Sequence, residues 1–151
     1  GKNGRPFLLY KFRTMQVAQN SIQATDKQRI TSLGKWLRRY SLDELPQLWN
    51  VLKGDMSLVG PRPLPQAYAA LYNDFQRQRL QVKPGITGWA QVNGRNQLTW
   101  TQKFAYDVYY VQNLSWQLDV KILLLTFQKV ITGHGVDAHK DQTMEVFKGN
   151  T

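Results

Sequence analysis

Clusters of proline and glycine divide this chain into short segments, and they constrain its fold more than any other feature. One cluster contains Gly60, Pro61, Pro63 and Pro65, and a second, further along the chain, is Lys83-Pro84-Gly85. Regular helices and central strands avoid such clusters, because proline fixes φ and lacks an N–H group. Between the clusters, apolar periodicity predicts helices over residues 31–40, 41–52, 66–82, 100–111 and 116–131, and extended segments over residues 7–15 and 86–92.

This order of elements predicts an α+β fold, a mostly helical single domain with a small antiparallel strand pair near the N-terminus. The length of 151 residues suits one domain with its own core. We therefore assign residues 1–151 to one domain, with the polar residues 133–151 as a mobile tail. Residues 1–6 are typical of a turn between two strands, so we expect the chain to begin inside a domain.

The charge balance predicts a polyanionic partner. Lys and Arg number 20 against 10 acidic residues, a net charge of +10. Nucleic acid, an anionic membrane surface and a phosphorylated substrate all fit this excess. The longest strongly apolar stretch, residues 122–125, is far shorter than the ~20 residues of a spanning helix. The wide apolar band of residues 116–131 suits either a core or lipid headgroups. The chain has no cysteine, which excludes disulfides and cysteine-based metal sites or nucleophiles.

The adjacent acids Asp43 and Glu44 have two readings. The sequence Ser41-Leu42-Asp43-Glu44 matches a capping box, with Ser41 as the N-cap. Both acids then simply complement a helix N-terminus. Alternatively, free N–H groups and the helix dipole keep a carboxylate ionised, and such a carboxylate can serve as a nucleophile or metal ligand.

Several cations and one further acid are candidates for the same site. Lys11 and Arg13 alternate on a predicted strand, Arg38 and Arg39 precede the acidic pair, and Arg95 lies in a Gly-Arg-Asn turn. Arg62 differs from the others, because Pro61 and Pro63 restrict its backbone and fix where its guanidinium starts. Asp107 lies in the middle of an aromatic helix, where it either faces water or pairs with a cation. His134 and His139 signal a metal site only weakly.

Five strings in this order resemble the bacterial sugar transferase family, the monotopic phosphoglycosyl transferases, and the match covers nearly the whole chain. The strings are KFRTM from Lys11, SLDELPQLWNVLKGDMS from Ser41, VGPRP from Val59, KPGITGWAQVNGRN from Lys83 and FAYDVYY from Phe104. The nearest likeness is to the small enzymes that start glycan assembly on undecaprenyl phosphate.

The resemblance implies a catalytic domain that transfers a sugar 1-phosphate from a UDP-sugar to a polyprenol phosphate. Asp43 would be the nucleophile, forming an aspartyl-phosphosugar intermediate and releasing UMP, and Glu44 would complete the pair with Mg²⁺ held by both acids. Lys11, Arg38, Arg62, Arg95 and Asp107 match positions around the substrate. The resemblance also implies an anionic membrane surface as partner and the cytoplasmic face of the bacterial inner membrane as location. Family members begin with an apolar re-entrant helix and a strand that residues 1–6 do not match, so we expect the membrane anchor to be missing from this chain.

Two other functions remain open from the residues. A basic nucleic-acid-binding module would use the +10 charge and the 12% aromatic content for phosphate contacts and base stacking, although no known binding motif appears. A truncated, non-catalytic scaffold would bind the donor or a protein without turnover. The sequence does not distinguish which sugar is carried.

Overall fold

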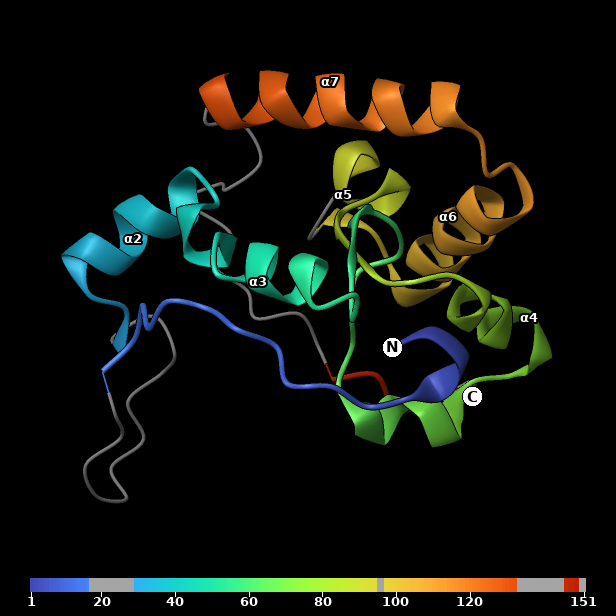
Figure 1. Cartoon of the computed structure of the whole chain (residues 1–151). Helices are drawn as coiled ribbons and strands as arrows, with labels where there is room; N and C mark the ends of the chain where they lie inside the picture. Colours follow the sequence, from blue (N-terminus) through green and yellow to red (C-terminus); the bar gives the residue numbers. More distant parts are fainter. Residues whose placement is uncertain (17–28, 95–96, 133–145, 150–151) are drawn as a thin grey trace.

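The computed structural model describes residues 1–16, 29–94, 97–132 and 146–149. Short helices predominate, and two long helices close the described fold (Figure 1). The α-helices are α2 (Ser32–Arg39), α3 (Gln47–Leu52), α4 (Asp74–Arg77), α5 (Trp89–Asn93), α6 (Trp100–Gln112) and α7 (Trp116–Thr132). The 3-10 helices are η1 (Lys2–Gly4), η2 (Leu42–Glu44), η3 (Gln66–Leu71) and η4 (Gln78–Gln81), and the strands are β1 (Ser57–Val59) and β2 (Gly85–Thr87). The predicted tail falls mostly outside the described residues.

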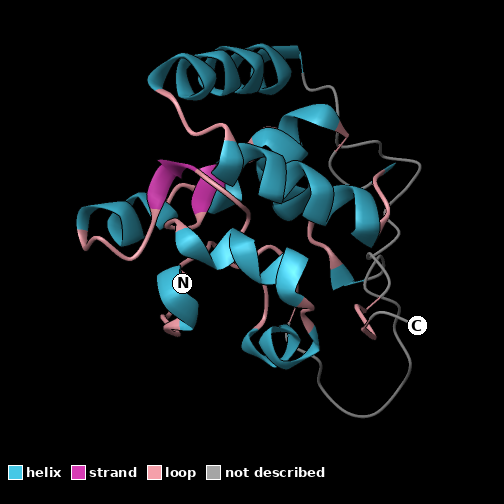
Figure 2. Ribbon diagram, turned by 90° about the vertical axis from the view of Figure 1, so that its right-hand side faces the viewer, coloured by secondary structure: helices cyan, strands magenta, loops and turns pink. Residues whose placement is uncertain are grey.

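The two strands form a parallel pair, so the predicted α+β class is confirmed but the predicted antiparallel pairing is wrong (Figure 2). Ser57 pairs with Gly85 and Val59 with Thr87. Parallel strands need a crossover connection, and η3, α4 and η4 supply it. Residues 7–15 form no regular strand, and their one sheet-like contact is an isolated antiparallel bridge between Met15 and Ile30.

The N-terminal segment is held by side-chain and loop contacts instead of a neighbouring strand. Asn50 is fully buried, donates to the Leu8 carbonyl at 2.7 Å and accepts from the Tyr10 N–H at 3.2 Å. The Phe12 N–H donates to the Asp43 carbonyl at 3.0 Å. These bonds satisfy an extended backbone without a sheet and bring Lys11 next to the acidic pair.

Capping hydrogen bonds explain why some predicted helices are observed as expected and why one is divided into shorter helices. Thr31 caps α2 by accepting from the Gly34 N–H at 2.9 Å, and Thr99 opens α6 with a capping box. The helix predicted over residues 66–82 is instead η3, α4 and η4, because Asn73 forms its own capping box with Gln76 and starts a new helix there. The segment predicted to be extended over residues 86–92 leaves β2 at Gly88 and enters α5.

Two apolar clusters form the core. One joins β1, α5, α6 and α7 through Val59, Val92, Tyr110 and Ile122. The other joins Tyr72, Phe104 and Phe147. Helix α7 covers α5 and the sheet with one face and leaves Leu124 and Phe127 exposed on another. In the described part of the chain, no helix combines the length and apolar character needed to cross a membrane.

Candidate functional site

Six of the seven predicted site residues line one cavity of 580 Å³. These six are Lys11, Arg38, Asp43, Glu44, Arg62 and Asp107. They come from the N-terminal segment, α2, η2, the loop after β1, and α6. Arg95, the seventh, lies outside the described residues, as do His134 and His139. The fold thus brings together groups that are up to 96 residues apart in sequence, from Lys11 to Asp107, while their roles stay predictions.

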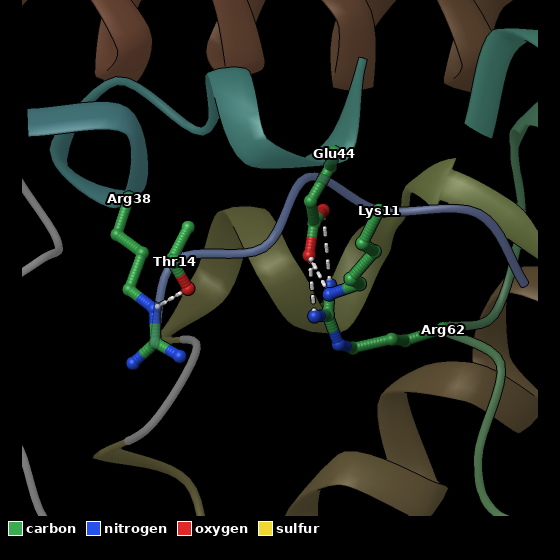
Figure 3. Close-up of polar contacts among 5 residues, drawn as sticks. All are labelled: Lys11, Thr14, Arg38, Glu44 and Arg62. Carbon is green, nitrogen blue, oxygen red and sulfur yellow. Dashed lines mark hydrogen bonds and ion pairs between the residues drawn. The ribbon is translucent and has the colours of Figure 1, made fainter. Parts of the chain in front are cut away.

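Glu44 is the centre of an ion-pair cluster with Lys11 and Arg62 (Figure 3). Its Oε1 lies 2.7 Å from Lys11 Nζ and 2.6 Å from Arg62 Nη2, and its Oε2 accepts from Arg62 Nη1 at 3.3 Å. Burial alone would raise the pKa of Glu44, but the charges and hydrogen bonds of Arg62 and Lys11 outweigh it and lower this pKa to about 2. Glu44 is therefore an anion that holds two cations in place.

The predicted capping box at Ser41 is not formed. Ser41 adopts a left-handed conformation with φ of 56°, and its side chain makes no cap hydrogen bond. Glu44 instead turns towards Lys11 and Arg62, because charge-assisted bonds to two cations are stronger than one bond to a backbone N–H group.

Asp43 has a different environment from Glu44. Burial and then the charge of Glu44 raise the pKa of Asp43, while Lys11 and Arg38 oppose this rise. A backbone N–H group does lower the pKa of Asp43, as the position at the start of η2 predicted, but burial and Glu44 outweigh it in the net direction. Asp43 makes no ion pair within 4.0 Å among the described residues, so its carboxylate is available to the cavity.

Arg38 extends from α2 into the cavity, and a hydrogen bond from one of its nitrogens orients the guanidinium group. Its Nε donates to Thr14 Oγ1 at 2.9 Å (Figure 3). Its two terminal nitrogens have no hydrogen-bond partner within the described part of the chain. Such a guanidinium presents a free two-nitrogen edge to an anion.

Asp107 pairs with Arg79, a cation that the sequence analysis missed. Arg79 Nε and Nη2 both lie 2.9 Å from Asp107 Oδ2, and the two side chains are only 4% and 5% exposed. The prediction that Asp107 faces water or pairs with a cation is resolved in favour of the pair. Nothing in the pattern of η4 marked Arg79 as buried.

Two more residues of the cavity wall were missed. Lys103 on α6 stands beside Arg62, and burial followed by the charge of Arg62 lowers the pKa of Lys103 to about 8. Gln91 on α5 has both amide atoms buried without a hydrogen-bond partner. Lys103 had no sequence signal, because a lone Lys on a helix is ordinarily a solvated residue. Gln91 lies within the string from Lys83 that carries the family resemblance, but nothing in that string singled out its side chain.

The acidic pair fits the chemistry of a magnesium site only in part. In the part of the chain that the structure describes, no three His, Cys, Asp or Glu side chains lie close enough together to hold a metal ion by themselves. Magnesium is usually held by one or two carboxylates together with substrate phosphates and water. Asp43 suits that role, whereas the Glu44 oxygens already contact Lys11 and Arg62.

Comparison with known proteins identifies the family. The sequence model described as "Bacterial sugar transferase" matches residues 1–133. The chain belongs to the bacterial sugar transferase family. All the residues that line the cavity fall within this matched range, and the family is the one that the sequence resemblance predicted.

Three relatives of this sugar transferase illustrate the range of the family. It is 53% identical to the uncharacterized sugar transferase EpsL of Bacillus subtilis, over 99% of this chain and 75% of the relative. It is 44% identical to the galactosyl transferase CpsE of Streptococcus agalactiae, over 89% of this chain and 34% of the relative. It is also 44% identical to a UDP-glucose:undecaprenyl-phosphate glucose-1-phosphate transferase of Escherichia coli, over 85% of this chain and 30% of the relative. The last two proteins are about three times as long as the part this chain matches.

Proposed function

We propose that this sugar transferase moves a sugar 1-phosphate from a UDP-sugar to undecaprenyl phosphate through a covalent intermediate on Asp43. Relatives named for transfer from UDP-glucose or UDP-N-acetylgalactosamine to undecaprenyl phosphate support the two substrates. The observation that carries the mechanism is the contrast within the acidic pair. Glu44 is occupied by two cations, whereas Asp43 offers an unpaired carboxylate to the same cavity.

In the first step, a carboxylate oxygen of Asp43 attacks the β-phosphorus of the UDP-sugar. The bond from this phosphorus to the bridging oxygen breaks, and UMP leaves with that oxygen and its electron pair. In the second step, a phosphate oxygen of the polyprenol attacks the same phosphorus, and the Asp43 carboxylate is released. Splitting the transfer in this way keeps the two anionic substrates from having to meet directly.

The cations of the cavity supply the charge neutralisation that phosphoryl transfer requires. Arg62 and Lys11 are held by Glu44, and the terminal nitrogens of Arg38 are open to a phosphate. Magnesium, held by Asp43 and the substrate phosphates, would add further neutralisation of the diphosphate. Glu44 could bind the metal only if one of its carboxylate oxygens left its contact with Lys11 or Arg62.

We further propose that the enzyme works at the cytoplasmic face of the bacterial inner membrane, with α7 lying against the anionic lipid surface. Val120, Leu124, Phe127 and Ile131 are exposed and recur at helical spacing along one face of α7. The net charge of +10 complements anionic lipid, and the acceptor proposed here is itself a lipid.

The test is incubation of the chain with Mg²⁺ and a panel of UDP-sugars, followed by assay of UMP and mass analysis of the protein. We expect UMP release and a phosphosugar mass on the peptide that contains Asp43. Asp43→Asn should abolish both, whereas Asp74→Asn, an exposed control on α4, should leave both intact. Full activity of the Asp43→Asn variant would remove Asp43 as the nucleophile. Donor binding without UMP release would favour the non-catalytic scaffold instead.

A further inference from the structure

Gln91 carries an unused pair of hydrogen-bonding groups inside the cavity. Its side-chain Nε2 and Oε1 are both buried, and neither has a partner. In the part of the chain that the structure describes, these are the only buried side-chain polar atoms left without one. The residue lies on α5 and lines the same cavity as Asp43, Glu44 and Arg62. Unpaired buried amides are rare in folded proteins, because each group loses its bonds to water without replacing them.

The wall around Gln91 differs from the wall around the acidic pair. The other lining residues that come from β2, α5 and α7 are uncharged, namely Ile86, Thr87, Ala90, Thr126 and Val130. The charged lining residues belong to other elements: the N-terminal segment, α2, η2, the loop after β1, η4 and α6. The cavity therefore has a cationic part that suits phosphates and a largely apolar part that contains one amide.

The two threonines of the apolar part have no proton to offer a ligand. Thr126 Oγ1 donates to the Ile122 carbonyl at 2.7 Å. The hydrogen in the 2.7 Å contact between Thr87 Oγ1 and Thr126 Oγ1 must then come from Thr87. The amide of Gln91 is thus the available side-chain donor in this part of the wall, and it has an acceptor beside it.

One free amide in a largely apolar wall suits a nucleobase better than a sugar. A hexose presents several hydroxyl groups in different directions, and each needs a partner when it is buried. Uracil is flat and presents a donor, N3–H, beside a carbonyl acceptor in one plane. A side-chain amide can meet that edge with two parallel hydrogen bonds, while apolar side chains cover the faces of the ring.

We propose that the Gln91 amide binds the uracil edge of the sugar nucleotide, with Oε1 accepting from N3–H and Nε2 donating to the adjacent carbonyl oxygen. This proposal rests on the proposed function, because it takes a UDP-sugar as the donor. It gives Gln91 the role of a donor-specificity residue, with the phosphates reaching from there towards Arg62, Lys11 and Arg38. The unpaired amide of the free protein is then explained as a group kept ready for its ligand.

The experiment measures the affinity of the chain for UDP, and for UDP methylated at N3 of the base, by calorimetry. Gln91→Met keeps the length and shape of the side chain but removes both hydrogen-bonding groups, and Gln81→Met is the matched control at an exposed position at the end of η4. We expect Gln91→Met to bind UDP about ten- to a hundredfold more weakly, the loss of two neutral hydrogen bonds. Its melting temperature without ligand should be unchanged or higher, because an unpaired buried amide has been removed.

The methylated nucleotide separates contact with the base from contact with any other part of the donor. The wild-type chain should bind it about tenfold or more weakly than UDP, and this penalty should shrink or disappear in Gln91→Met, because both changes remove the same bond. Equal binding of the two nucleotides by the wild-type chain, or penalties that simply add, would overturn the assignment of Gln91 to uracil. Unchanged UDP affinity in Gln91→Met would also overturn it while leaving the proposed function intact. Absence of UDP binding by the wild-type chain would instead overturn the proposed function and this inference together.

Discussion

The guanidinium of Arg79 donates a hydrogen bond of 2.5 Å to the backbone carbonyl oxygen of Arg62. Arg79 is itself fixed by the buried carboxylate of Asp107 and by the Tyr72 hydroxyl, which it meets at 3.2 Å. Arg62 stands between Pro61 and Pro63 and reaches Glu44 with its side chain. Proline stiffness and a buried ion pair therefore act on the same backbone, and together they aim one cation at the acidic pair.

We predict that Asp107→Asn destabilises the protein and displaces Arg62. The change leaves the Arg79 charge buried without its counterion, which costs about 3 kcal/mol and lowers the melting temperature by about 6–12 °C in a protein of this size. Thermal unfolding measures the loss, and UMP release at a permissive temperature measures the effect on Arg62. Asp74→Asn on the surface of α4 is the matched control and should change stability by less than about 0.5 kcal/mol. An Asp107→Asn variant as stable as the wild type would show that the pair does not hold the loop.

Sequence patterns were reliable where local physics decides the structure. Apolar periodicity over residues 31–40, 100–111 and 116–131 predicted α2, α6 and α7 to within a residue of their observed ends. The strings around Asp43, Glu44 and Arg62 indicated residues that the fold brings to one cavity.

Long-range contacts were beyond the same patterns. The strand pairing depends on how residues 57–59 and 85–87 meet in space. The predicted capping box at Ser41 does not form, because Glu44 pairs with two cations from distant segments. Arg79, Lys103 and Gln91 look like ordinary surface residues in sequence. Their importance arises only from burial, which no local periodicity encodes for a polar side chain.

Acid should weaken the fold through Glu44. The folded-state pKa of this carboxyl lies at about 2, below its ordinary value of 4.5, so its contribution to stability is present above about pH 4.5 and is lost as the pH falls towards 2. We expect this contribution to be about 2 kcal/mol, discounted because Arg62 is 44% exposed. Urea unfolding across this pH range should show a smaller acid-induced loss in Glu44→Gln than in the wild type. Parallel pH curves for the two proteins would contradict the prediction.

Donor binding should weaken in alkaline solution through Lys103. Burial and Arg62 lower the pKa of Lys103 to about 8, so the free enzyme loses this positive charge as the pH rises through that value. The KM for the UDP-sugar should rise above about pH 8 while kcat changes less, because a bound phosphate favours the charged form. Lys103→Arg keeps its charge and should extend the flat part of the KM profile to higher pH. A KM rise at the same pH in Lys103→Arg would assign the titration to another group.

The two hydrogen bonds that hold the N-terminal segment to Asn50 should be required for the site. Asn50→Leu leaves the Leu8 carbonyl and the Tyr10 N–H without their side-chain partner, which we expect to cost about 1–3 kcal/mol. Lys11 follows directly in the chain, so UMP release should fall as well. Asn113→Ala is the control, because its side chain donates to the Tyr109 carbonyl at its own helix end, away from the N-terminal segment. Hydrogen exchange over residues 8–12 should rise in Asn50→Leu and not in Asn113→Ala. Unchanged exchange in Asn50→Leu would show that Asn50 does not hold the N-terminal segment in place.

The apolar face of α7 should decide binding to lipid surfaces. Leu124 and Phe127 are 65% and 66% exposed and stand one helical turn apart. Replacing both by Gln removes apolar area that would enter the headgroup region, and we expect about 2 kcal/mol, or roughly thirtyfold, weaker partition to vesicles that contain anionic lipid. Phe75→Gln on α4, where the side chain is 47% exposed, is the control for loss of an exposed aromatic residue elsewhere. Sedimentation with vesicles measures the partition, and added salt should weaken binding of every variant because the +10 charge contributes to all of them. If the double variant and Phe75→Gln lost affinity equally, the contact with lipid would not run through α7.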